Sequence, residues 1–436
     1  MFGSPGSTIA ADAPNFVIII ADDLGWNDIG VYGNTSVQTP NIDKLAANGL
    51  RFDNAFLTTS SCSASRASIL TGKYPHTNGL VHLHQSLSAD QITLGQLLRE
   101  RGYHTESVGK WHIGDPVKSQ FSNVIDDRIS PATAHWLDRL ARSPKGVPFF
   151  FWLASRDPHR PHTPTEDSLP LVYDPAKIEI PEGFVDGPRT RRAFADYYRA
   201  VSRFDRDIGR VVAELERQGV LDNTAVIVMS DNGRPFPWGK LTLYDDGIKT
   251  PFIVHWPKKV ARGATRGQLI SMVDLAPTIL EWAGLPLPDS MDGISFAEML
   301  GSETATTREY VFAERNWHGS NAHERAIRSL GYLYKENQFP LEGSCLVGPY
   351  RSKPSFKEYA AVPRNLTASD FDRECFSNNR SRVELKASTQ VGNTRTPNLA
   401  NSDEYRQQLE TMRNRLNEWR ENTHDFDYQS YTRPDR

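Results

Sequence analysis

Four strand-like runs, each followed within a few residues by charged or amide side chains, constrain the fold of this chain more than any other feature. They are residues 15–21, 103–108, 148–154 and 224–229. Short apolar runs rich in β-branched residues are typical of strands that are buried on both faces of a parallel sheet. Helical patterns separate them, including the long amphipathic stretch 192–218. This alternation predicts an α/β fold, with a mostly parallel sheet flanked by helices.

The sequence changes character near residue 302, where segments become shorter and more polar. The remaining predicted elements are helices over 39–49, 93–102, 272–284 and 402–421, and strands over 251–256, 309–313 and 326–334. We therefore expect a catalytic domain over residues 14–302. A smaller C-terminal α+β subdomain, with an antiparallel sheet and a terminal helix, is expected over residues 303–425.

Polar side chains follow each of the four main predicted strands. In chain order they are Asp22 and Asp23, then Lys110 and His112, then His159, then Asp231 and Asn232. Open parallel sheets bind ligands at the carboxyl ends of their strands, so these side chains are expected to converge on one edge. Polar residues after a single strand would be explained by a solvated turn. Polar residues after all four strands favour a functional site.

The chemistry of these residues indicates what the edge could bind. Asp22, Asp23, Asp231 and Asn232 offer oxygen ligands, which select a hard divalent cation, calcium in preference to magnesium, over zinc. Cationic donors surround them, namely Lys110, His112, His159 and Lys240. Such donors suit a group with several anionic oxygens, so the predicted ligand is a tetrahedral oxyanion, either sulfate or phosphate.

A cysteine lies just ahead of a short predicted helix, in the stretch 60–72. A helix N-terminus stabilises an anion, and Arg66 would add a cation one turn beyond Cys62. Taken alone, a small buried cysteine in a serine-rich turn would explain this pattern. The two other cysteines, Cys345 and Cys375, could form a disulfide with each other or remain free.

Composition excludes two classes of protein. A net charge of −3 argues against a general nucleic-acid binder, which needs a strongly basic face. No run of about 18 apolar residues is present, so no membrane span is expected. Residues 1–14 resemble either a vector-derived extension or the remnant left after a signal peptide is removed, and we expect a periplasmic or secreted protein.

The motifs at the predicted edge resemble those of the type I, formylglycine-dependent sulfatases. Cys62-Ser63-Ala64-Ser65-Arg66 followed by Leu70-Thr71-Gly72 resembles the family signature. Residues 21–23, 109–112 and 230–233 resemble the other site motifs, in the same order. The resemblance covers residues 14 to 425 and implies an alkaline-phosphatase-like fold.

The resemblance implies a role for each matching residue. Cys62 would be converted after translation to formylglycine, whose hydrated gem-diol is the nucleophile. Asp22, Asp23, Asp231, Asn232 and residue 62 would bind calcium. Arg66 would activate the diol and His112 assist it, Lys110 and Lys240 would neutralise the sulfate, and His159 would protonate the leaving group. Ala64 stands where the family usually has proline, which implies the radical class of maturation enzyme that accepts alanine.

Within the family, residues 83–85, 157–160, 230–237 and 419–425 resemble the heparan N-sulfatase (N-sulfoglucosamine sulfohydrolase) branch. This implies release of a sulfamate group from the end of a sulfated glycan. Candidate sugar contacts are His84, Arg160, His162, His318, His323, Glu324 and Arg325. Alternatives are an O-sulfatase on another polysaccharide such as ulvan, a phosphoester or phosphonate hydrolase, and an inactive binder of sulfated glycans. A homodimer is compatible with the sequence.

Overall fold

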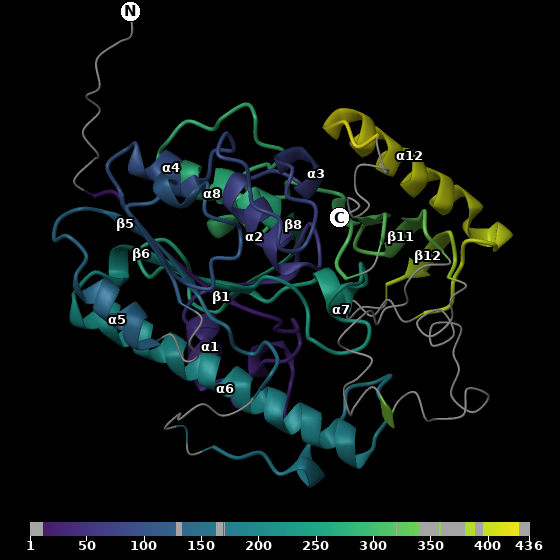
Figure 1. The fold of residues 1–436 in the computed structure, drawn as a ribbon, viewed down its shortest axis with the longest axis horizontal. Helices are drawn as coiled ribbons and strands as arrows, with labels where there is room; N and C mark the ends of the chain where they lie inside the picture. Colours follow the sequence, from purple (N-terminus) through teal and green to yellow (C-terminus); the bar gives the residue numbers. More distant parts are fainter. Residues whose placement is uncertain are drawn as a thin grey trace, which may run out of the picture.

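The computed structural model describes residues 12–127, 133–162, 169, 171–319, 321–340, 357–358, 380–388 and 396–426. Its main sheet has eight strands in the order β4-β3-β5-β1-β6-β7-β2-β8 (Figure 1). The strands are β1 (Asn15–Ala21), β2 (Leu50–Phe56), β3 (His104–Gly109), β4 (Asn123–Asp126), β5 (Phe149–Ala154), β6 (Thr224–Ser230), β7 (Phe252–His255) and β8 (Ala264–Ser271). In this sheet β7 pairs antiparallel with both neighbours, and all other pairs are parallel. The predicted fold class, a mostly parallel sheet flanked by helices, is confirmed.

Helices cover both faces of the main sheet (Figure 1). They are α1 (Pro40–Ala47), α2 (Cys62–Thr71), α3 (Pro75–Asn78), α4 (Leu94–Arg99), α5 (Thr133–Ala141), α6 (Pro188–Arg217), α7 (Asp245–Ile248) and α8 (Leu275–Trp282). Strand β1 shows why the core has two halves, since successive side chains of a strand point to opposite faces. Ile18 and Ile20 pack with residues of α2, α4 and α8, whereas Val17 and Ile19 pack with residues of α1, α5 and α6.

The C-terminal part contains a second sheet, which is antiparallel with strand order β12-β11-β10-β9. Its strands are β9 (Val311–Arg315), β10 (Glu324–Arg328), β11 (Tyr332–Asn337) and β12 (Val383–Ala387), and α12 (Arg406–Thr423) packs on it. The run 326–334, predicted as one strand, is instead a hairpin, because the backbone N–H of Tyr332 donates to the hydroxyl of Ser329 and closes a tight turn. The domain division at residue 302 stays a prediction.

The predicted disulfide and the expected lack of a membrane span can be checked only for the residues that the structure describes. Cys345 and Cys375 lie outside the described residues, so the disulfide stays a prediction. Within the described ranges, no helix combines the length and the apolar composition needed to cross a bilayer.

Candidate active site

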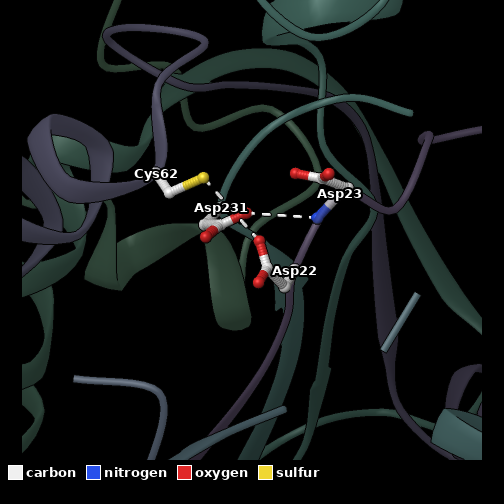
Figure 2. A group of neighbouring side chains, drawn as sticks. All are labelled: Asp22, Asp23, Cys62 and Asp231. Carbon is white, nitrogen blue, oxygen red and sulfur yellow. Dashed lines mark hydrogen bonds between the residues drawn. The ribbon is translucent and has the colours of Figure 1, made fainter. Parts of the chain in front are cut away.

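The four predicted strand exits lie side by side, because β3, β5, β1 and β6 are consecutive in the sheet. The parallel pairing aligns their carboxyl ends, and the backbone N–H of Asp231 donates to the carbonyl of Ala21 at 3.1 Å. Strand β2 leads to Cys62 at the start of α2. Figure 2 shows the Cys62 side chain pointing toward the carboxylates of Asp22, Asp23 and Asp231.

These four side chains form a compact cluster. Each offers one ligand atom, and these atoms all lie within 4.8 Å of one another. The three aspartates are fully buried, and so is Asn232, whose amide donates to Asp23 Oδ1 at 2.6 Å. Two buried oxygens, Asp23 Oδ2 and Asn232 Oδ1, have no hydrogen-bond partner among the residues that the structure describes. A buried oxygen without a partner is costly, so this cluster fits a hard divalent cation that would take both atoms as ligands.

Buried cations balance the carboxylates. Lys110 Nζ lies 2.6 Å from Asp22 Oδ2, and Lys240 Nζ lies 2.5 Å from Asp23 Oδ1. Burial alone would raise the pKa of Asp22, but Lys110 and further cations hold it well below its usual range. Burial raises the pKa of Asp231, against the opposing effect of Arg66. In this site, buried carboxylates are therefore paired with buried cations.

Arg66 contacts the cluster through Asp231. Its Nε donates to Asp231 Oδ2 at 2.8 Å, and its Nη1 donates to the carbonyl of Lys110 at 2.5 Å. The guanidinium thus joins the loops after β3 and β6. Removing it would leave a buried carboxylate without its cation.

Cys62 is the first residue of α2, as expected, and its side chain is 2% exposed. Its Sγ lies 3.0 Å from Lys240 Nζ and 3.7 Å from Asp22 Oδ1. Burial raises the pKa of the thiol to about 11, although Lys110 and Lys240 act in the opposite direction. Since only a thiolate is a good nucleophile, an unmodified Cys62 would be unreactive near neutral pH.

Three histidines stand beside Cys62. His112 Nε2 and His84 Nδ1 are 2.8 Å apart, and His318 Nδ1 lies 2.8 Å from the hydroxyl of Ser61. Burial, with Lys110 and Arg66, lowers the pKa of His112 to about 2. Burial and Lys240 also lower the pKa of His318 well below its usual range. Both rings are therefore neutral.

The loop after β5 brings His159 to the same edge. His159 Nε2 lies 3.8 Å from Asp23 Oδ2, and Nδ1 forms a hydrogen bond with the backbone carbonyl of Arg160. The guanidinium of Arg160 stacks over Phe236, 4.7 Å from its ring centroid, and the His162 ring contacts Tyr197. The roles of these three residues stay predictions.

The other predicted sugar contacts lie in the second sheet. Glu324 is 1% exposed and pairs with Arg315 at 2.7 Å and with Arg380 at 2.8 Å. Arg325 is fully buried and pairs with Asp425, which follows α12. His323 is also buried. The described contacts of Glu324 and Arg325 stabilise this sheet, and they give no support to a role in sugar binding.

A buried ion pair that was not predicted from the sequence supports the His159 loop. Arg203, in the middle of α6, donates to both oxygens of Asp157 at 3.0 and 2.7 Å. The carbonyl of Asp157 in turn accepts from the backbone N–H of Asp22 at 3.1 Å. The amphipathic pattern of residues 192–218 predicts a packing helix, yet Arg203 falls among its buried residues. A charged residue at a buried position was the signal.

We expect Arg203→Leu to lower the free energy of unfolding by about 3–5 kcal/mol, because it leaves the Asp157 carboxylate buried without its cation. Arg217→Leu, in the same helix, removes an ion pair with Glu214 in which the arginine is exposed to water, and it should cost far less than Arg203→Leu. Urea denaturation of both variants tests this. Equal costs would show that the Arg203–Asp157 pair is not a structural brace.

Comparisons with known proteins agree with this geometry. Residues 14–285 match the family model Sulfatase, and residues 236–336 match the model N-sulphoglucosamine sulphohydrolase, C-terminal. The chain is 31% identical to human N-sulphoglucosamine sulphohydrolase, over 94% of this chain and 90% of that protein. It is also 31% identical to an ulvan-active sulfatase of Formosa agariphila, over 76% of this chain and 67% of that protein. One similar solved structure, a protein in complex with its substrate D-glucosamine-2-N,6-O-disulfate, has a TM-score of 0.74 at 20% identity and covers 95% of this chain and 99% of that one.

Proposed function

Because the chain belongs to the sulfatase family, we propose that it releases the N-sulfo group of a glucosamine residue at the end of a heparan-type glycan. The observation that carries this choice is the 31% identity to human N-sulphoglucosamine sulphohydrolase over nearly the whole of both chains. The match of residues 236–336 to the C-terminal model of the same activity also supports it.

We propose calcium as the metal. The ligands would be Asp22, Asp23, Asp231 and Asn232, together with the side chain at position 62. The two buried oxygens without partners support this assignment, as does the excess of carboxylate ligands. When bound, the ion would polarise a sulfate oxygen and offset the negative charge that three carboxylates bring to one place.

We also propose that Cys62 acts as formylglycine. That group supplies a hydrated aldehyde, one hydroxyl of which would be the nucleophile once it is activated. Ala64, buried beside it in α2, fits a maturation enzyme of the radical class that accepts alanine. A location in the periplasm or outside the cell is part of the same proposal.

The remaining residues bind the sulfate and move protons. Lys240 contacts both residue 62 and Asp23, and Lys110 contacts Asp22, so both ammonium groups stand where sulfate oxygens would arrive. His159 has Nδ1 fixed by a backbone carbonyl, which leaves Nε2 to hand a proton to the departing amine. Neutral His112 can accept a hydrogen bond from the nucleophile.

Sulfate release from different substrates tests this function. For protein produced with a maturation enzyme, we expect kcat/KM for a terminal N-sulfoglucosamine disaccharide to exceed that for a 6-O-sulfated N-acetylglucosamine disaccharide by at least about 100-fold. Preference for O-sulfate, or for ulvan fragments, would replace the proposal with the O-sulfatase alternative. Faster cleavage of an aryl phosphate or phosphonate would favour the phosphoester and phosphonate hydrolases. Binding without turnover, in protein that carries formylglycine, would indicate a glycan-binding protein.

A further inference from the structure

A cavity of about 470 Å³ lies at the end of the main sheet opposite the candidate active site. Its lining residues precede β1, β3 and β6, and others follow β7 and α8. Since β1, β3 and β6 run parallel, their amino ends face away from Asp22 and Asp231, roughly 20 Å along the strands. The volume falls within the range of ~300–1,000 Å³ that is typical of small-molecule sites.

The rim of this cavity is cationic. Arg101, Lys258 and Lys259 are exposed and line it, with Asp12 as the only carboxylate among the lining residues that the structure describes. Across the described part of the chain, none of the three cations forms an ion pair. The protein as a whole has a net charge of −3 and does not attract anions. This cluster of positive charge can attract them locally.

The floor of the cavity is aromatic. Tyr103 and Trp256 are 3% and 2% exposed, and Trp282 is partly exposed. Trp256 and Trp282 meet edge to face, with ring centroids 5.8 Å apart. The hydroxyl of Tyr103 and the indole N–H groups of both tryptophans are buried, and none has a hydrogen-bond partner in the described structure. These polar atoms are shut off from the cavity, so a ligand there would meet chiefly the partly exposed ring of Trp282.

We propose that this cavity is a second saccharide site, which binds a sulfated sugar residue without taking part in the reaction. The cationic rim would bind the sulfate, and the ring of Trp282 would contact the apolar face of the sugar. The choice of a saccharide follows from membership of the sulfatase family, and it does not depend on the N-sulfo specificity proposed above.

Calorimetric titration of the Cys62→Ala protein with a heparin-derived hexasaccharide tests the proposal, because this variant binds without turnover. We expect two binding events. Lys258→Glu together with Lys259→Glu should weaken one of them by at least ~10-fold. In protein that retains Cys62, the same pair of substitutions should leave kcat/KM for a terminal N-sulfoglucosamine disaccharide unchanged.

The matched control is Lys145→Glu together with Lys177→Glu, two exposed lysines that do not line the cavity. It changes the net charge equally and should change neither binding event by more than ~2-fold. Trp282→Ala should weaken the same event as the lysine variant. A single binding event, equal losses in both lysine pairs, or inorganic sulfate that occupies the cavity as tightly as the hexasaccharide would each overturn the proposal. If the hexasaccharide binds at this cavity but the enzyme prefers O-sulfate, the proposed N-sulfo specificity is wrong and the second site stands.

Discussion

Replacing Cys62 with alanine is expected to lower sulfate release by at least ~10⁴-fold. The cluster of carboxylates and lysines is built around this one side chain, with Lys240 Nζ at 3.0 Å and Asp22 Oδ1 at 3.7 Å from its sulfur. An alanine can neither be converted to formylglycine nor supply a nucleophile. The rate of sulfate release from a terminal N-sulfoglucosamine disaccharide measures the loss.

Ser65→Ala is the matched control for this variant. Ser65 lies in the same buried helix, and its hydroxyl has no hydrogen-bond partner among the described residues, so the substitution should leave the rate within ~3-fold. Intact-mass analysis of the wild-type protein gives the fraction of formylglycine, which is lighter than cysteine. Activity should rise in proportion to that fraction. Full turnover by Cys62→Ala, or by protein that holds only the thiol, would contradict the mechanism.

The position of the site could be predicted because it depends on strand patterns alone. A run such as residues 15–21 is buried on both faces, so its neighbours must be parallel strands and its carboxyl end must meet theirs. That argument placed Asp22, His159 and Asp231 at one edge without any knowledge of the strand order. It also placed Lys110 there, although β3 is less apolar than the others.

Other parts of the structure depend on partners that are distant in sequence. Strand β12 is short and polar, and it is defined by its pairing with β11. Glu324 and Arg325 have the charge expected of an exposed, sugar-binding segment. Instead they are buried, because Arg380 and Asp425 come from other segments to neutralise them. Sequence spacing cannot show such pairs, so the burial of Glu324 and Arg325 could not be predicted, and their role in sugar binding stays a prediction.

The largest effect expected outside position 62 comes from Asp23, which we expect to bind calcium through Oδ2, an oxygen without a hydrogen-bond partner among the described residues. Asp23→Asn keeps the shape of the side chain but removes its charge. It should lower kcat/KM by about 10³-fold. Calcium at 100 times its dissociation constant stabilises a folded protein by about 2.7 kcal/mol, so it should raise the melting temperature of the wild type by several degrees. The variant should lose most of this shift.

The thermal measurement separates metal binding from catalysis, because it needs neither substrate nor formylglycine. Asp53→Asn is the control, since Asp53 is partly exposed and its pair with Arg51 lies outside the cluster. It should keep the full calcium shift. Asp23→Asn also leaves Lys240 without its carboxylate at 2.5 Å, so the metal-free variant should already melt below the wild type. A variant that melts lower but responds fully to calcium would show that Asp23 holds Lys240 in place and does not bind the ion.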